Sequence, residues 1–411
     1  MQRIHRRRWP TPVHHDGRDY LTTEQVAKVL GVKESTVYSY VSRGRLQSRR
    51  IEGVSGSVFP VDEIEKLLTA GRPRPPAGVV ERIRTQVTYL HDDRLYYRGR
   101  DVAELACELS FEQVASLLWE QPWPGAGASS HPTAGGVGAR VDVALGPSAR
   151  GLDRVRLIVD LLGADDPRRH QLEPAAVAAK AATVLRTIVG GGPLQGDGGD
   201  GRFAARLWPL LTEESPTPAR VGILNAALVL LADHDLSAGT VAARVAASAR
   251  GSVYAVIGAG LGAFDGPMHG GATTFAYRFL AGALDDPETA IGERLRMGDR
   301  LPGTGHVVYR HCDPRAETLT GLLTDAADGD PRVLRAMASV SEAVGSSTFV
   351  NSDLALAALA LSYRMRPDAA EMIFAVARIV GWTAHALEEY GEERLRFRPE
   401  GVYTGVRPTG V

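Results

Sequence analysis

Two short segments of this chain each place a histidine beside glycines. His269 lies in residues 265–272, which read DGPMHGGA, and His306 lies in residues 303–315, which read GTGHVVYRHCDPR. Because glycine has no Cβ, a substrate can approach the backbone closely there, and the neighbouring imidazole is placed to contact it. Arg315 follows the second histidine by nine residues and adds a permanent positive charge. The pattern predicts acid–base chemistry on an anionic substrate.

The composition is that of an ordinary globular chain of 411 residues, with 44% hydrophobic and 23% charged residues. A chain of this length accommodates two or three domains. No apolar run reaches the roughly 18 residues of a membrane-spanning helix, and residues 1–8 lack the apolar stretch of a signal peptide. We therefore expect no membrane partner. Cys107 and Cys312 are the only cysteines, which implies no disulfide framework and favours a cytoplasmic protein.

Charge is distributed unevenly along the chain. Residues 1–74 contain 14 Lys and Arg against 8 Asp and Glu, a balance of +6, so the remaining residues must sum to −7 to give the net charge of −1. A basic N-terminal segment followed by an acidic remainder favours a polyanionic partner for the N-terminal segment. The alternative is a solvated basic tail without a partner.

Residues 19–70, which we call the head, follow the order of a winged helix-turn-helix domain. A capped helix at 22–30 ends at Gly31, and a second helix at 35–41 ends at Gly44, with the short turn that this motif requires. The elements expected after them are a strand at 46–51, a return strand at 57–59 and a helix at 60–68. This stretch resembles the helix-turn-helix domains of the MerR and excisionase type.

That resemblance implies that the head binds DNA with its second helix. The residues expected to face the major groove are Lys33, Glu34, Ser35, Thr36 and Ser39, and those expected at phosphates or the minor groove are Arg43, Arg45, Arg49 and Arg50. The alternative is a protein-interaction module that has the fold but does not bind DNA.

A Pro-rich linker at 71–78 separates the head from the body, residues 79–411, and a basic arm at 1–18 precedes the head. The body has helical periodicity, and few of its segments alternate like strands, so the predicted fold class is mainly α. The expected helical segments are 102–119, as a helix pair, and 152–162, 174–189, 221–231 and 240–256. The low-complexity segments 121–138 and 190–201 are predicted as loops. The second lacks the carboxylate ladder of a calcium loop.

Two other site types are not expected. Residues 258–263, GAGLGA, fit the loose dinucleotide fingerprint, but a continuous helix is expected at 240–256 just before them and Pro267 interrupts the chain soon after. No strand–helix–strand rhythm surrounds them, so we expect no nicotinamide site. The histidines and cysteines lack the spacing of metal ligands, and no metal is expected.

Residues 82–404 resemble citrate synthases. The resemblance is carried by blocks in the family's order at 88–101, 110–119, 232–236, 266–272, 303–315, 350–353, 377–385 and 398–399. It implies an all-helical body with a large domain at 79–272 and 372–411 and a small domain at 273–371. It also implies a homodimer, acyl-CoA and oxaloacetate as substrates, and no metal or redox cofactor.

The resemblance assigns roles to three groups that join an acyl-CoA to a 2-oxo acid. It implies that Asp353 removes the proton next to the thioester carbonyl while His269 donates a hydrogen bond to the thioester oxygen. His306 then donates to the oxaloacetate carbonyl as the carbon–carbon bond forms. An alternative for Asp353 is a carboxylate that caps the helix after it.

The same resemblance supplies the ligands of the substrates. By position in the family, the groups that bind oxaloacetate are His234, Arg315, Arg378 and Arg398. Arg398 is expected to reach the neighbouring subunit's site, and Arg378 has the alternative of a structural ion pair. Arg310 is a candidate for the CoA phosphates, with an exposed surface arginine as the alternative. His311 and His385 are interpreted as structural.

Three departures from the family pattern leave the activity open. Thr304 replaces an aromatic residue between the glycines, and Val350 and Ser352 flank the motif asparagine. The first hypothesis is an acyltransferase, either a citrate synthase or a 2-methylcitrate synthase that uses propionyl-CoA, with a DNA-binding head. The second is a transcription regulator whose synthase-like body senses an acyl-CoA, oxaloacetate or citrate.

Overall fold

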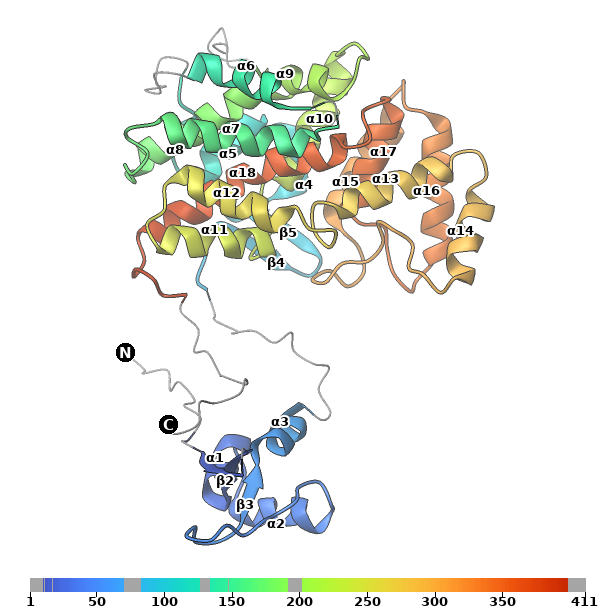
Figure 1. Ribbon diagram of the computed structural model, residues 1–411. Coiled ribbons are helices and arrows are strands. Elements are labelled where there is room, and N and C mark those ends of the chain that lie inside the picture. The colour runs from blue at the N-terminus through green and yellow to red at the C-terminus, as the bar shows by residue number, and fades with distance from the viewer. Residues whose placement is uncertain are drawn as a thin grey trace. The chain divides into compact units, whose positions relative to one another are not determined.

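The computed structural model describes residues 10, 12–16, 18–69, 83–125, 134–146, 148–190 and 202–397. The chain divides into two compact units, residues 1–82 and 83–411, which are described separately (Figure 1). The linker predicted at 71–78, Arg398 and nearly all of the 190–201 loop lie outside the described residues.

The head is a short sheet packed against three helices. Its elements are β1 (Val13–His15), β2 (Arg18–Thr22), α1 (Thr23–Leu30), α2 (Glu34–Ser42), β3 (Val58–Pro60) and α3 (Val61–Thr69), and the antiparallel sheet has the order β1-β2-β3. Thr22 caps α1 through a reciprocal pair of hydrogen bonds with Gln25. Gly31 ends α1 with φ 67°, a backbone conformation that glycine adopts without strain.

The head core consists of apolar side chains that the three helices and the sheet bury together, and its fully buried members are Leu21, Val26, Val37, Phe59 and Ile64. Two expectations differ from the structure. The predicted strand at 46–51 is reduced to a single bridge between Arg49 and Val58. Residues 13–15 and 18, assigned to a basic arm, instead form β1 and the start of β2, because β2 pairs with β1 on one side and with β3 on the other, so the head includes these residues.

The body is built almost entirely from helices. After a small antiparallel sheet of β4 (Thr88–His91), β5 (Arg94–Tyr97) and β6 (Arg100–Asp101), its helices are α4 (Val102–Glu108), α5 (Phe111–Trp119), α6 (Ala134–Ala144), α7 (Gly151–Asp165), α8 (Pro174–Ile188), α9 (Arg202–Leu211), α10 (Pro218–Leu231), α11 (Ala238–Ser248), α12 (Val253–Phe264), α13 (Ala272–Gly282), α14 (Pro287–Arg296), α15 (Pro314–Asp325), α16 (Pro331–Val344), α17 (Ser352–Ser362) and α18 (Ala369–Tyr390). The mainly α prediction and the helix pair at 102–119 are confirmed.

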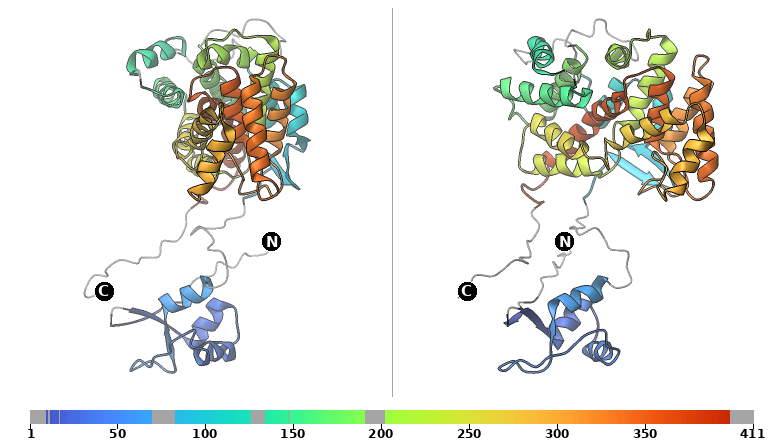
Figure 2. Two further views of the ribbon diagram at one scale, coloured as in Figure 1. Left: turned by 90° about the vertical axis from the view of Figure 1, so that its right-hand side faces the viewer. Right: turned by 45° about the vertical axis from the view of Figure 1, so that its right-hand side comes forward.

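Helix α18 is the central element of the body. It packs against α5, α7, α8, α10, α11, α12, α13 and α17, and Figures 1 and 2 show it running through the middle of the larger helix group. Among the described residues α18 alone is long and apolar enough to cross a membrane by length and composition, but 94% of its apolar window is buried in the body. Helices α13 to α17 form the second group beside it.

The predicted continuous helix at 240–256 is wrong. The structure divides it into α11 and α12, because Arg250 adopts φ 60° and Ser252 caps a new helix by accepting a hydrogen bond from the Ala255 N–H. The two helices then fold back and pack against each other. Residues 258–263 lie inside α12 rather than in a turn, which removes the geometry that a dinucleotide phosphate needs.

Candidate active site

The first glycine-flanked histidine lies in the loop between α12 and α13. Gly270 is required there because a Cβ would lie 2.1 Å from the Phe264 ring. The His269 ring packs 5.0 Å from Phe264 and 5.8 Å from Phe374, centroid to centroid. Burial, with a smaller contribution from Arg378, lowers the pKa of His269 to about 4, so the imidazole is neutral at neutral pH. Among the described residues its buried Nε2 has no hydrogen-bond partner.

An ion-pair cluster fixes the start of this loop. The Asp265 carboxylate accepts hydrogen bonds from Arg150 at 2.8 Å and from Arg156 at 2.6 Å. Arg150 also contacts the buried Glu371 at the start of α18. These contacts tie the loop that carries His269 to α7 and α18.

The second histidine follows a strand-like segment that is paired with the approach to α17. The Gly305 N–H donates to the Phe349 carbonyl at 2.7 Å, and the Asn351 N–H donates to the Gly303 carbonyl at 2.9 Å. The Asn351 side chain donates to the Gly305 carbonyl at 2.8 Å. Both glycines have positive φ, 79° and 71°, which favours glycine at these positions. This ladder holds His306 next to the first turn of α17.

The departures from the family pattern lie in this ladder. Thr304 and Val350 form its central bridge, and the Thr304 hydroxyl donates to the Leu301 carbonyl at 2.7 Å. Ser352 donates its backbone N–H to Asp313 at 3.0 Å. The substituted side chains therefore leave the backbone pairing around His306 intact.

His306 lies in a cluster of aromatic rings. Its ring centroid is 4.9 Å from that of His234 and 5.0 Å from that of Tyr309, and the Tyr309 hydroxyl hydrogen-bonds the Nε2 of His234 at 2.9 Å. The Val308 N–H donates to His306 Nδ1 at 3.2 Å, so the neutral ring carries its proton on Nε2. Burial, followed by the charge of Arg315, lowers the pKa of His306 to about 4.

An arginine–aspartate pair connects this cluster to the candidate base. Arg315 donates to both carboxylate oxygens of Asp313, at 2.9 and 2.8 Å, and its guanidinium lies 5.5 Å from the centroid of Tyr309. Asp313 also accepts from the Ser352 N–H at the start of α17. Burial raises the pKa of the neighbouring Asp353 to about 6, with Arg315 opposing the shift and Asp313 adding to it. The cap of α17 is Asn351, so the helix has its cap without the Asp353 carboxylate.

Arg378 is the buried cation on α18. Its Nε donates to the Leu231 carbonyl at 2.9 Å, and its guanidinium lies 4.9 Å from the Phe374 centroid. In the described part of the chain its buried Nη2 has no hydrogen-bond partner, which leaves a charged donor for a bound anion. Burial lowers the pKa of Arg378 to about 10, and the guanidinium remains charged at neutral pH.

Among the described residues, His234, His306 and Arg315 form one cationic cluster around the Tyr309 ring. The positive charges of Arg315 and Arg378 both help to lower the pKa values of His234 and His306. His269 is linked to Arg378 through Phe374, because the Phe374 ring contacts both side chains. Sequence reasoning missed Tyr309 and Asp313, although both lie in the segment that it singled out. Among the described residues no group of three or more His, Cys, Asp and Glu side chains has the arrangement of a metal site.

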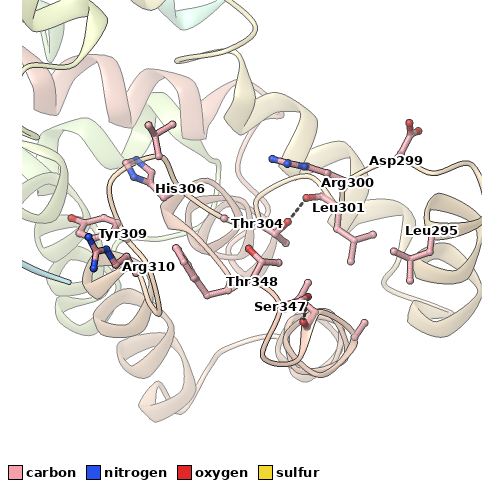
Figure 3. A pocket seen from close by; sticks show the side chains of 15 residues that line it. Leu295, Asp299, Arg300, Leu301, Thr304, His306, Tyr309, Arg310, Ser347 and Thr348 are labelled. Carbon is pink, nitrogen blue, oxygen red and sulfur yellow. Dashed lines mark hydrogen bonds between the residues drawn. The ribbon is translucent and has the colours of Figure 1, made fainter. Parts of the chain in front are cut away.

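A pocket of about 680 Å³ opens beside His306 (Figure 3). Thr304 and Arg310 both line it, and Arg310 has an exposed side chain and a backbone N–H that donates to Asp93 at 2.7 Å. Arg300 also lines the pocket and was missed, although it directly precedes the segment 301–305 that leads to the histidine. The pocket has the chemistry for an extended ligand that ends in an anion.

In the head, the candidate DNA-contacting residues lie on one side of α2 and in the segment after it. Val37 points into the core, whereas Lys33 and Ser35 are exposed, Thr36 and Ser39 are half-buried, and Arg43 and Arg45 are exposed, as are Arg49 and Arg50. The Ser39 hydroxyl donates to the Ser35 carbonyl at 3.2 Å.

Comparison with known proteins agrees with the fold. The family model described as citrate synthase, C-terminal domain, matches residues 78–400, and a helix-turn-helix domain model matches residues 20–72. Citrate synthase 2 of Bacillus subtilis (strain 168) is 31% identical over 78% of this chain and 93% of its own length. A 2-methylcitrate synthase of Mycobacterium tuberculosis (strain H37Rv) is 32% identical over 76% of this chain and 84% of its own length.

A solved citrate synthase from Thermotoga maritima MSB8 has 26% identity and a TM-score of 0.63, and the match covers 81% of this chain and 95% of the other. The family model alone covers well over half of the chain. The chain therefore belongs to the citrate synthase family and is a citrate synthase-like enzyme with an N-terminal helix-turn-helix domain.

Proposed function

We propose that the body condenses an acyl-CoA with oxaloacetate and releases CoA, giving citrate from acetyl-CoA or 2-methylcitrate from propionyl-CoA. The observation that supports the proposal is that Asp313 accepts hydrogen bonds from Arg315 and from the N–H of Ser352, the residue before Asp353. The Tyr309 ring contacts both Arg315 and His306. This arrangement puts a weak base, a neutral hydrogen-bond donor and a fixed cation in one buried site. A citrate synthase and a 2-methylcitrate synthase have nearly the same sequence identity to this chain, 31% and 32%, so identity does not favour either acyl-CoA.

The first step is removal of the proton next to the thioester carbonyl. Asp353 accepts this proton, and its raised pKa makes it a better base than an exposed carboxylate. The neutral His269 donates a hydrogen bond to the thioester oxygen as that oxygen gains enolate charge. A donor of this kind is worth roughly 2.7–4 kcal/mol in other enzymes, measured by removing it.

The second step is attack of the enol carbon on the oxaloacetate carbonyl. His306 donates its Nε2–H to the carbonyl oxygen, which becomes the hydroxyl of the product. Arg315 and Arg378 bind the substrate carboxylates together with His234, because planar guanidinium groups pair with carboxylates in two-point contacts. Hydrolysis of the thioester then releases CoA. The reaction needs no electron carrier, and the proposal includes no resident cofactor.

Arg398 completes the proposed oxaloacetate site from the neighbouring chain of a homodimer. The dimer is part of the proposal and is tested by light scattering, which should give twice the monomer mass of 44.0 kDa. An Arg398→Ala variant that keeps the dimer should bind oxaloacetate less tightly than the wild type.

The direct test is thiol release from acetyl-CoA and from propionyl-CoA in the presence of oxaloacetate. The proposal expects turnover by the wild type and loss of turnover in Asp353→Ala. The ratio of kcat/KM for the two acyl-CoAs assigns the substrate, and one methylene typically changes it by about 10- to 200-fold. If neither acyl-CoA turns over although the protein is folded, the condensation proposal is wrong.

A second function is favoured by the head. The match to a helix-turn-helix domain and the exposed arginines after α2 support DNA binding, which makes the protein a regulator as well as an enzyme or, without turnover, a sensor of acyl-CoA or oxaloacetate. The test is a salt-dependent gel shift with the full chain and with a chain that lacks residues 1–74. A shift that is the same in both would remove DNA binding from the head.

A further inference from the structure

A buried series of hydrogen bonds links α11, α18 and the turn after α10. The side chains of Arg244, His385 and Asp233 are all completely buried. Arg244 Nη1 lies 2.8 Å from His385 Nδ1, and His385 Nε2 lies 3.2 Å from Asp233 Oδ2. The proposed reaction uses none of these groups.

The donors and acceptors in this series of hydrogen bonds are fixed. An arginine can only donate, so His385 Nδ1 accepts from Arg244 and the Nε2–H of His385 donates to Asp233. The Thr88 hydroxyl donates to the same Asp233 oxygen at 2.5 Å. Asp233 therefore accepts two hydrogen bonds as a carboxylate. A buried carboxylate that loses its hydrogen-bond donors costs much free energy, so these donors fix the position of the Asp233 carboxylate.

The backbone of Asp233 is fixed as well. Its N–H donates to the Tyr97 hydroxyl at 2.9 Å, and the Tyr97 hydroxyl donates to its carbonyl at 2.8 Å. Gly381 of α18 packs so closely against this residue that a Cβ there would lie 2.3 Å from Asp233 Oδ1. The side chain, N–H and carbonyl of Asp233 are thus all held by the β-hairpin and α18.

This fixed residue is next to the proposed oxaloacetate ligands. His234 follows Asp233 directly and contacts Tyr309 and His306. Arg378 bonds to the carbonyl of Leu231, two residues before Asp233, and the Asp233 carboxylate acts as a nearby counter-charge to its guanidinium. Displacement of Asp233 would move an imidazole and unbalance a buried cation at the same time.

We propose that His385 and Tyr97 are positioning residues for the oxaloacetate site, which act by fixing Asp233 between His234 and Arg378. The inference rests on the proposed condensation activity. Asp353 belongs to α17 and is held through Asn351 and the ladder before it, away from this network. Loss of the network should therefore weaken oxaloacetate binding and leave acyl-CoA binding and proton removal largely intact.

The experiment compares His385→Leu and His385→Gln with the wild type and adds Tyr97→Phe as a gentler variant. Tyr254→Phe is the matched control, because Tyr254 is also a buried tyrosine whose hydroxyl bonds a carboxylate, Asp166, at 3.0 Å outside this network. Calorimetry gives the Kd of oxaloacetate, thiol release gives the KM of each substrate and kcat, and thermal melting verifies folding.

We expect His385→Leu to raise the Kd and KM of oxaloacetate about tenfold, because a buried carboxylate loses a donor, with Tyr97→Phe showing a smaller rise. His385→Gln should recover part of the loss, since its amide can donate to Asp233. The acyl-CoA KM and the control should not change. If folded His385→Leu and Tyr97→Phe both bind oxaloacetate as the wild type does, the positioning role is wrong while the condensation proposal stands. A wild type that neither binds oxaloacetate nor turns over overturns both.

Discussion

The head and the body place their candidate functional residues in opposite ways. In the head these residues come from one continuous stretch, 33–50, and most of them are exposed. In the body they come from five separate segments, around 234, 269, 306–315, 353 and 378. His234, Arg315 and Arg378 are buried, and His269, His306 and Asp353 are half-buried. Burial in the body lowers the pKa values of His269 and His306 and raises that of Asp353.

Because of this difference, function in the two regions should depend on different solution conditions. Exposed charges are screened by salt and contribute independently, so function in the head should vary with ionic strength and change gradually upon mutation. Buried groups act in a low-dielectric site in which small displacements and single protons matter, so function in the body should depend on pH and fail sharply.

The largest effect is expected from removing one imidazole of the body. His306→Leu should lower kcat about 10²- to 10³-fold, because the developing hydroxyl loses its hydrogen-bond donor. The matched control is His311→Leu in the same segment, where the backbone N–H rather than the ring makes the contact to Asp93. Steady-state thiol release measures both. Equal activity of His306→Leu and the control would remove His306 from the reaction.

A methyl group on the ladder that holds His306 should also be costly. In Gly303→Ala the new Cβ meets the Leu354 Cβ at 2.5 Å and the backbone keeps a φ of 79°, so we expect a loss of at least about 2 kcal/mol in unfolding free energy. Gly298→Ala is the control for φ alone, because Gly298 has a φ of 75° and open space at the Cβ position. Chemical denaturation compares the two. A similar loss in both would show that the contact with Leu354 is unimportant.

The contrast also explains how much the sequence could predict. Glycine-flanked histidines and Arg315 are visible in the sequence because their local backbone requirements leave a pattern. Tyr309 and Asp313 were missed because their roles, stacking on Arg315 and joining it to α17, depend on which distant segments meet. The break between α11 and α12 was missed because apolar periodicity continues across Arg250, where the backbone turns.

The head shows the same limit on a smaller scale. Its helices were predicted from caps and glycines, which are local signals. Of its sheet, only the return strand at 57–59 is predicted and corresponds to β3, because β1 and the first residue of β2 lie in a segment that reads as a basic arm. Strand pairing depends on a partner about 40 residues further along the chain, Val58–Pro60, and no local pattern contains that information.

The protonation of Asp353 sets the expected pH dependence of the body. With a pKa of about 6, the carboxylate is ionised above this pH, so kcat/KM should fall about tenfold per pH unit below it. The same raised pKa means that ionisation opposes folding, and this cost appears as the pH rises from the ordinary carboxyl range through 6. Asp353→Asn should therefore melt at a higher temperature than the wild type at pH 8, with less difference at pH 4. A profile that is flat between pH 5 and 7 contradicts the assignment.

Single charges in the head should have smaller effects. Arg43→Ala and Arg45→Ala should each weaken DNA binding less than tenfold and reduce the slope of log affinity against log salt by about 1. Arg364→Ala is the control, because its side chain is 84% exposed on the body. Fluorescence anisotropy at several salt concentrations gives the slopes. A pair of variants with the wild-type slope would show that these arginines do not contact phosphates.

The smallest effect is expected from the cap that starts α1. Thr22→Ala removes the oxygen that accepts the Gln25 N–H, and such a loss typically costs about 1 kcal/mol. Thr22→Ser is the control, since it keeps the accepting oxygen. Because the head has its own core, the change should lower only the melting transition of the head, which calorimetry of the full chain resolves from that of the body. An equal shift in both transitions would mean that the two units unfold together, and the contrast between a locally determined head and an assembled body would then not extend to their stability.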